Sequence, residues 1–444
     1  MKRSVLLIVL CGLLALGCSQ PGPMPGEGAT AFVGATVFDG RATIPDAVLI
    51  VRDGRVEAVG PASQVAVPEG AEQVDISGRY VTPGFINAHG HVGGAIGLQS
   101  TQPGADTYTT NLLVDQLGLY GRYGVTTVVS LGGEGPEAFA LRDAQNTPSL
   151  DRGRIFVAGT IVTADTPEGA REQVNQNADM AADFIKIRVD DNLGSGTKMA
   201  PEIYQAVIDQ AHQRGLPVAA HFYYLEDAKG LLNAGVDFLV HSVRDMPVDD
   251  EFVALIKEKN VCYCPTLMRE VSTFTYESVP AFFSDPFFLK EADPAVLEQL
   301  RSPERQERTK NSKSAQQYKK ALEVAKANVK TLADQGVKIA MGTDTGPAAR
   351  FQGYFEHMEL ELMAEAGLTP QQILTAATAD AAECSNLTDV GALEAGKWAD
   401  FLVFSANPLE NVTNSKSLES VWVAGNRLAE PPMGAPTAEP SASE

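Results

Sequence analysis

The sequence VTPGFINAHGH, residues 81–91, places two histidines two positions apart at the end of an apolar run. Side chains at positions i and i+2 of a strand point to the same side, so His89 and His91 are expected to face one point in space. Four of the six histidines of the chain lie in such runs. Similar short apolar runs with a polar residue occur downstream, at FIKI (184–187), VAAH (218–221), LVH (239–241) and MGTD (341–344).

Eight segments have the composition of strands, and stretches with helical periodicity separate them. Helices are expected at residues 201–214 and 369–382, the second with Thr369 and Gln372 in the order of a capping box. Eight alternating units predict an α/β fold, a (β/α)8 barrel with its active site at the carboxyl ends of the strands. The predicted strands are 84–89, 124–131, 154–161, 183–189, 217–221, 237–241, 261–267 and 337–342.

The segments at both ends of the chain differ in residue pattern from this α/β region, which we place at residues 83–389. Residues 31–82 and 390–428 contain short β patterns separated by turn residues such as those at 53–54. Because these two β-rich segments flank one long region, we expect them to form a small β-sandwich-like domain together.

Residues 1–18 have the features of a bacterial lipoprotein signal peptide, with Lys2 and Arg3 before a short apolar run and small residues before Cys18. Cys18 would then carry the lipid, and an ordinary secretory signal is the alternative. Either reading exports the protein, so we expect it to face the periplasm or the cell exterior. Residues 19–30 are predicted to be a flexible tether and residues 429–444 a disordered tail.

The formal net charge of −21 argues against nucleic acid or an anionic membrane surface as a partner. We therefore expect a small-molecule substrate and membrane contact only through the lipid at Cys18, with a homo-oligomer left open. After removal of the signal, the remaining cysteines are Cys262, Cys264 and Cys384. A bridge between Cys262 and Cys264 would be strained, so no disulfide framework is expected, and this pair is interpreted as small buried apolar residues.

The chain resembles the amidohydrolase superfamily over residues 31–428, and within it the branch of imidazolonepropionase-like and prolidase-like proteins. The matching motifs are PGFINAHGH (83–91), GVTT (124–127), GTD (342–344) and GALEAGKWAD (391–400). The resemblance implies a binuclear metal centre, with Zn²⁺ the best fit to the ligand types and Mn²⁺, Co²⁺ or Fe²⁺ as alternatives. One ion would be held by His89, His91 and Asp344, the other by His221 and His241, and carbamylated Lys186 would bridge them.

Lys186 decides between one ion and two. On its strand it shares a face with Phe184 and Arg188, and this face is expected to point into the barrel. An unpaired ammonium there would be unfavourable, and an ion pair with Asp344 is one solution. The resemblance implies another, because carbamylation removes the positive charge and creates a carboxylate ligand.

The resemblance also implies roles in catalysis. Asp344 would accept the proton of a water acidified by the ions and pass it to the leaving nitrogen, and His241 is the second catalytic candidate. Tyr223, Arg244 and Arg350 lie in loops after their strands and could bind a substrate carboxylate, or could be ordinary surface residues. Prolidase-like relatives use a tyrosine at the position that matches Tyr223.

Three other features are expected to be structural or are left open. His212 and His357 lie in predicted helices and are interpreted as packing or surface residues. The aromatic segment at 274–288 and the helical region at 301–334 could form a lid over the substrate, or could simply pack onto the barrel.

The function predicted from these features is an exported amidohydrolase that cleaves a dipeptide or an N-acyl amino acid with a free carboxylate. Hydrolysis of a cyclic amide, a lactone or a phosphotriester is the alternative within the fold. Imidazolonepropionase itself fits less well, because it uses one metal and is cytoplasmic. A solute-binding lipoprotein without turnover is the alternative outside enzymes, and the complete ligand set, with Asp344, argues against it.

Overall fold

The structure, a computed structural model, describes residues 26–429 of the chain. The predicted signal peptide, residues 19–25 of the predicted tether and the predicted tail from residue 430 lie outside the described residues. The tether predicted to extend to residue 30 ends earlier, because β1 begins at Ala29 and the N–H of Gly26 donates to the carbonyl of Glu69 at 2.9 Å. Within residues 26–429, no helix is long and apolar enough to cross a membrane.

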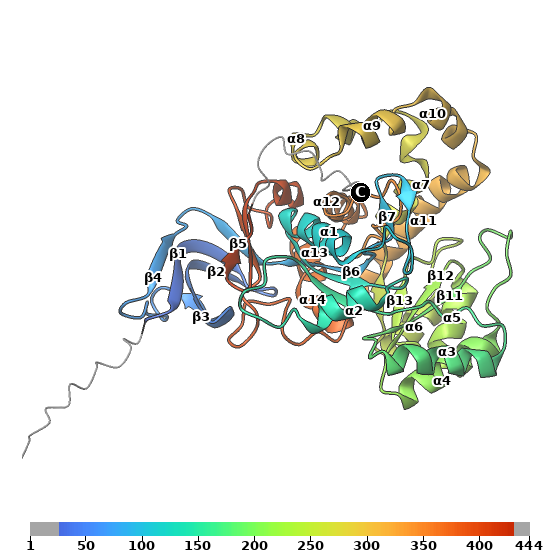
Figure 1. Cartoon of the computed structure of the whole chain (residues 1–444), viewed down its shortest axis with the longest axis horizontal. Coiled ribbons are helices and arrows are strands. Elements are labelled where there is room, and N and C mark those ends of the chain that lie inside the picture. Colours follow the sequence, from blue (N-terminus) through green and yellow to red (C-terminus); the bar gives the residue numbers. More distant parts are fainter. Residues whose placement is uncertain (1–25, 430–444) are drawn as a thin grey trace, which may run out of the picture.

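Strands from both ends of the chain form one eight-stranded sheet (Figure 1). Its strand β1 pairs antiparallel with β2 and parallel with β4 and β5, and β5 pairs antiparallel with β15. Phe32 and Ala31 alternate between two apolar clusters, one on each face. The strands therefore belong to one hydrogen-bonded sheet, in place of the two expected of a sandwich. They are β1 (Ala29–Phe38), β2 (Thr43–Arg52), β3 (Arg55–Pro61), β4 (Glu72–Asp75), β5 (Tyr80–Pro83), β15 (Phe401–Phe404), β16 (Leu418–Val423) and β17 (Asn426–Arg427).

The middle of the chain contains two parallel sheets, of order β10-β9-β6 and β11-β12-β13-β14. A parallel bridge between Val162 and Ile187 connects them at one side. At the other side, Tyr263 forms a bridge with Ile339, and the N–H of Ala88 donates to the carbonyl of Met341 at 2.9 Å. The α/β class is thus confirmed. The eighth predicted strand, residues 337–342, pairs with β14 and β6 through these few backbone hydrogen bonds. The strands are β6 (Phe85–Gly90), β9 (Val125–Ser130), β10 (Arg154–Val157), β11 (Ile185–Val189), β12 (Val218–Phe222), β13 (Phe238–Val240) and β14 (Cys262–Cys264).

A helix follows each parallel strand, so strand and helix alternate along the chain. These helices are α1 (Thr110–Arg122), α2 (Pro136–Asp143), α3 (Pro167–Asp179), α4 (Pro201–Gln213), α5 (Leu225–Ala234), α6 (Asp250–Glu258), α7 (Leu267–Phe274) and, after residues 337–345, α12 (Tyr354–Glu365). A small hairpin of β7 (Ala95–Ile96) and β8 (Gln99–Ser100) follows β6, and η3 (Val412–Lys416) precedes β16.

The helix predicted at 369–382 is two helices, α13 (Pro370–Ala376) and α14 (Ala379–Cys384). The capping box of Thr369 and Gln372 is confirmed. The helix ends at 376 because the carbonyls of Ala376 and Ala377 accept hydrogen bonds from Met341 and Ile86, in the parallel strands. The region predicted as helical at 301–334 is likewise divided, since Ser312 caps a new helix after residue 311.

The segment between β14 and residue 337 is an insertion rich in aromatic residues, drawn in yellow to orange in Figure 1. Phe282, Phe283 and Phe288 are buried, and their rings contact one another and those of Phe351 and Tyr354, mostly edge to face, near the start of α12. These rings pack the insertion onto the strand-and-helix core, which agrees with one of the two interpretations given for this segment. After α7 its elements are η1 (Thr275–Glu277), η2 (Ala281–Ser284), α8 (Pro286–Leu289), α9 (Pro294–Leu300), α10 (Pro303–Lys310) and α11 (Lys313–Asp334).

The structure corrects the expectation for the cysteines. Cys262, at the start of β14, forms a disulfide with Cys384, at the end of α14, with 5.6 Å between their Cα atoms. Cys264 stays reduced and buried, as expected. The two partners are 122 residues apart, so no local spacing in the sequence indicates the pair. Only the packing of α14 beneath the parallel strands brings them together.

Candidate metal centre

Backbone pairing brings the two ends of the α/β region together at the site. The carbonyl of His89 accepts from the N–H groups of Thr343 and Asp344, and the N–H of His91 donates to the carbonyl of Thr345 at 2.8 Å. Gly342 fits between β14 and β6 because a Cβ there would lie 2.5 Å from the Sγ of Cys264 and 2.8 Å from the backbone nitrogen of His89. The GTD motif therefore brings Asp344 beside His89, on β6, and His91, directly after β6.

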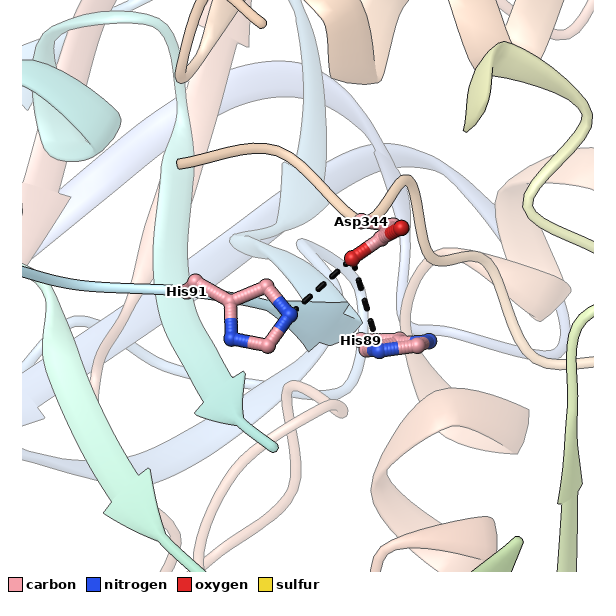
Figure 2. A group of neighbouring side chains, drawn as sticks. All are labelled: His89, His91 and Asp344. Atoms are coloured by element: carbon pink, nitrogen blue, oxygen red, sulfur yellow. Dashed lines mark hydrogen bonds and ion pairs between the residues drawn. The ribbon is translucent and has the colours of Figure 1, made fainter. Parts of the chain in front are cut away.

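His89, His91 and Asp344 form a compact group of potential metal ligands (Figure 2), with one ligand atom of each within 4.8 Å of the others. Oδ1 of Asp344 lies 2.9 Å from Nε2 of His91 and 3.7 Å from Nε2 of His89. Two imidazoles and one carboxylate converging on one point are a ligand set that suits Zn²⁺ and similar divalent ions.

The other three predicted ligands continue from this group. Nζ of Lys186 lies 3.4 Å from Nε2 of His89. The rings of His89 and His241 are 4.6 Å apart between centroids, and those of His241 and His221 are 4.2 Å apart. The structure thus brings all six predicted ligands into one cluster, although their roles stay predictions.

The electrostatics of the cluster match neutral imidazoles around an ionised carboxylate. Burial lowers the pKa of His89 and His241 well below the ordinary value, and lowers that of His221 to about 3. Burial would raise the pKa of Asp344, but Arg350 and His91 outweigh it and hold the pKa well below the ordinary value. Neutral imidazoles and a carboxylate are the forms that bind metal.

Lys186 is fully enclosed, and burial lowers its pKa to about 7 against the opposing effect of Asp344. A substantial share of the amine is then neutral near physiological pH. Nδ1 of His89, also buried, has no hydrogen-bond partner in the part of the chain that the structure describes. The donor set therefore fits divalent ions, and a neutral lysine is the form that can become a carbamate.

The backbone at the site is unusual at the ends of three strands. His241, Thr266 and Asp344 have φ values of +80°, +46° and +60°, in the left-handed region that residues other than glycine seldom adopt. The hydroxyl of Thr266 lies 2.7 Å from Nδ1 of His241 and fixes that ring. Such strain is typical of functional sites, where the surrounding structure holds it in place.

Two buried glutamates that sequence reasoning missed support the ligands from behind. Glu134 accepts from the hydroxyl of Ser130 at 2.6 Å and from the N–H groups of Gly132 at 2.9 Å and Gly159 at 2.8 Å. The carbonyl of Gly132 in turn lies 3.1 Å from Nδ1 of His91. Burial raises the pKa of Glu134 to about 7. It thus orders the loop that orients His91.

Glu356, on α12, is the second. Its Oε1 accepts from Asn87 at 2.6 Å, from Thr343 at 2.8 Å and from Thr345 at 2.6 Å. The two threonines flank Asp344, so this carboxylate holds the loop that carries it. An acidic residue in the sequence of a helix gives no sign of such burial, because Glu356 lies among other glutamates, in EHMELE.

Asp190 is a third missed residue, directly after the strand that carries Lys186. Its carboxylate forms a short contact with Nε2 of His221. A carboxylate at the carboxyl end of a parallel strand is a signal that the sequence does contain, in IKIRVD.

The three predicted substrate residues lie at different parts of the cluster, and the two arginines among them already have partners. Arg350 donates to Oδ2 of Asp344 at 2.5 Å, so it holds the aspartate instead of facing open space. Arg244 is fully buried, where a surface loop position was one expectation, and its Nε lies 3.1 Å from Glu270 of the insertion. Its guanidinium lies 4.8 Å from the ring centre of Tyr223.

Arg244 nevertheless retains two nitrogens without a hydrogen bond. Nη1 donates to the carbonyls of Phe222 and Ser242, whereas Nη2 and Nε, the latter paired with Glu270 by charge, are buried without a hydrogen-bond partner in the described residues. Glu270 also pairs with Arg269, which donates to the hydroxyl of Tyr318 on α11 at 3.1 Å. The insertion therefore completes this side of the site, a connection that strand spacing in the sequence does not show.

The two remaining histidines lie away from the cluster. His212 is partly exposed on α4 and pairs with Asp237 at 2.9 Å. His357 is buried, with its two ring nitrogens bonded to Ser415 and to the carbonyl of Tyr123. Both contacts are structural.

The fold and the ligand cluster are those of a metal-dependent hydrolase. The chain belongs to the amidohydrolase family, whose sequence model matches residues 80–428. Membership assigns it to the hydrolases that act on carbon–nitrogen bonds, and the resemblance to the imidazolonepropionase-like and prolidase-like branch is confirmed.

Among curated proteins, the chain is 23% identical to the imidazolonepropionase of Pseudomonas putida (strain GB-1), over 83% of this chain and 90% of that enzyme. An uncharacterized protein of Mycobacterium tuberculosis (strain H37Rv) is 26% identical over 51% of this chain. The match spans 60% of the length of that relative.

Among solved structures, a Bifidobacterium longum protein assigned as a prolidase has a TM-score of 0.71 and is 26% identical, over 91% of this chain and 95% of that one. A Xaa-Pro dipeptidase with methionine bound in its active site has a TM-score of 0.72 and is 22% identical, over 90% and 99% of the two chains.

We expect Glu356→Ala to lower the free energy of unfolding by about 2–4 kcal/mol, because it leaves three buried donors without their acceptor. Glu365→Ala is the matched control on the same helix. It removes an exposed ion pair with Lys326 and is expected to change stability by about 1 kcal/mol or less. Urea unfolding of the two variants measures both values, and equal losses would contradict the supporting role of Glu356.

Proposed function

We propose that the chain is an exported binuclear metal-dependent amidohydrolase that cleaves the amide bond of a dipeptide or an N-acyl amino acid. The observation that carries this proposal is the convergence of His89, His91, Lys186, His221, His241 and Asp344 on one cluster in the parallel-strand region. Within it, we take the two parallel sheets and the residues that bridge them to be one closed (β/α)8 barrel with the site at its carboxyl end.

Two ions are proposed because the cluster has two halves with Lys186 near their junction. His89, His91 and Asp344 would hold one ion, and His221 and His241 the other. The neutral amine of Lys186 can add to carbon dioxide and lose a proton, which gives a carbamate with two oxygens for the two ions. Mixed imidazole and carboxylate ligands favour Zn²⁺, with Mn²⁺, Co²⁺ or Fe²⁺ as alternatives.

When bound, such ions acidify a water and polarise a carbonyl group. Asp344 is the base that would take the proton of the attacking water, since its carboxylate is ionised and lies at the first half of the cluster. The same carboxyl group would then deliver the proton to the nitrogen that leaves. Arg350 holds the carboxylate in place for both transfers, and His241 would take part from the second half of the cluster, as a ligand of the ion there.

A substrate with a free carboxylate is proposed because of Arg244 and Tyr223. The unpartnered Nη2 of Arg244 is a buried cationic donor, and such a group gains a strong hydrogen bond from an anionic acceptor. The prolidase and dipeptidase among the structural relatives accord with this substrate class.

Cleavage of a cyclic amide is the second candidate. The imidazolonepropionase of P. putida is similar to this chain over most of both lengths, and it supports that alternative more than lactone or phosphotriester hydrolysis. The residues that would hold two ions favour the first candidate. A solute-binding protein without turnover would not need the base Asp344 or the buried Lys186.

Export as a lipoprotein is supported by the sequence of residues 2–18 and by the disulfide between Cys262 and Cys384. Disulfides persist in oxidising compartments outside the cytoplasm. The bridge thus accords with a protein anchored by lipid at Cys18 and facing the periplasm or the cell exterior.

Metal content tests the centre. Protein produced with zinc or manganese and bicarbonate is expected to contain about two ions per chain, and Lys186→Ala to contain about one or fewer, because the bridging carboxylate is lost. Lys338→Ala, on a lysine paired with Glu383 at the surface, is the matched control. Elemental analysis measures the ions, and ¹³C NMR with labelled bicarbonate detects the carbamate. A value near one that Lys186→Ala leaves unchanged would exclude the bridge.

Substrate charge tests the carboxylate contact. Amidation of the C-terminus of a good dipeptide substrate should lower kcat/KM by roughly tenfold to a thousandfold, the effect of losing a charged hydrogen bond. Arg244→Met should cause a similar loss on the free acid and little on the amide, and Tyr223→Phe offers a milder second variant. Tyr224→Phe is the control, because that hydroxyl donates to Asp191 instead. Equal losses on acid and amide would favour uncharged cyclic amides.

Localisation is tested at Cys18. Cys18→Ser is expected to abolish labelling by a radioactive fatty acid and to release the protein from the membrane fraction. Lipid labelling that persists in this variant would exclude the lipoprotein assignment.

A further inference from the structure

The four histidines of the cluster differ in what holds the ring nitrogen that would not bind metal. Nδ1 of His91 lies 3.1 Å from a backbone carbonyl, that of Gly132. Nδ1 of His241 lies 2.7 Å from the hydroxyl of Thr266. For both rings, Nε2 is left to face the cluster.

His221 is held through its other ring nitrogen, Nε2. Its Nε2 contacts the carboxylate of Asp190, in the loop after β11. An ionised carboxylate only accepts hydrogen bonds, so Nε2 must carry the hydrogen, and Nδ1 then carries the lone pair. The carboxylate thereby decides which nitrogen of this ring can bind an ion.

Asp190 is itself fixed in place. It is almost fully buried, with a side chain 2% exposed. Its Oδ1 accepts from the N–H of Asn192 at 2.7 Å and from Arg188 at 3.2 Å, while Oδ2 contacts His221. A carboxylate with one oxygen anchored by its own loop and the other on the imidazole has little freedom to rotate.

Of the three outer partners of the rings, Asp190 is the charged one. A carboxylate that accepts from a metal-binding imidazole fixes the ring and raises its basicity, which strengthens the bond to the metal. Its negative charge also offsets the positive charge of an ion nearby. The half of the cluster formed by His221 and His241 contains no aspartate of its own in the proposed ligand set, so this charge matters most there.

We propose that Asp190 is a positioning residue of the second metal site, which holds His221 with its hydrogen on Nε2 and directs Nδ1 to the ion. The proposal rests on the binuclear centre proposed above. It assigns Asp190 no contact with the ion or with substrate, and its effect passes through the imidazole of His221.

The test compares Asp190→Ala, Asp190→Asn and a control in the full chain. Asp190→Asn keeps an oxygen acceptor for Nε2–H but removes the charge. The control is Asp191→Asn, which removes the same charge from the next residue. Asp191 is partly exposed to solvent and accepts hydrogen bonds from Gly194 and Tyr224, and it forms no contact with His221 in the structure.

The first readout is metal affinity, measured by competition of a chelating dye with Zn²⁺ for metal-free protein. Asp190→Ala should weaken one of the two ions by about 10- to 100-fold and leave the other unchanged. Asp190→Asn should lose less, and Asp191→Asn should bind like the wild type. Unchanged binding of both ions by Asp190→Ala would overturn the proposal. Saturation of that variant at one ion would overturn it too, because Asp190 would then be a ligand.

The second readout needs no metal and no substrate. Histidine-selective ¹⁵N NMR of the metal-free protein, with His221 assigned through His221→Gln, should show hydrogen on Nε2 in the wild type and in Asp191→Asn. Asp190→Ala should lose that preference. Hydrogen on Nδ1 in the wild type would overturn the proposal. Wild-type protein that passes both readouts but hydrolyses no amide would contradict the proposed function and leave the role of Asp190 intact.

Discussion

The site depends on the backbone pairing of β6 with residues 341–345. His89 and Asp344 are 255 positions apart, yet the carbonyl of one accepts the N–H of the other. Without that pairing, His89 and His91 would have no carboxylate beside them, and the cluster would lack Asp344, the proposed base. Gly342 permits the approach, because any side chain there would meet Cys264 and the backbone of His89.

Behind this pairing, buried acids give the ligands their orientation. Glu134 fixes the loop whose carbonyl contacts His91, and Glu356 fixes the loop that carries Asp344. Burial raises the pKa of both carboxyl groups, to about 7 and about 6. Each is kept in the interior by three or more hydrogen bonds, which reduces the unfavourable free energy of removing it from water.

Much of this arrangement can be predicted from the sequence, because the spacing of its apolar residues indicates where the strands and helices lie. Apolar runs that contain or end in a polar residue indicate that His221, His241 and Lys186 lie on neighbouring strands, and they come close together once those strands are parallel. The capping box at Thr369 is local chemistry, and the structure has it. The contacts that the sequence does not indicate are those between residues far apart in the chain. The disulfide of Cys262, the burial of Glu356 and the pairing of Arg244 with Glu270 depend on how α12, α14 and the insertion pack, and no spacing encodes those contacts.

The disulfide between Cys262 and Cys384 encloses the insertion and the segment that carries Asp344 in one covalent loop. A protease that cut an exposed turn anywhere inside that loop would leave both fragments attached to each other. The cut ends would remain concentrated beside their original partners, so re-association would be an intramolecular event. At the proposed location outside the cytoplasm, a chain nicked in this way would keep Asp344 and the histidines of the cluster together.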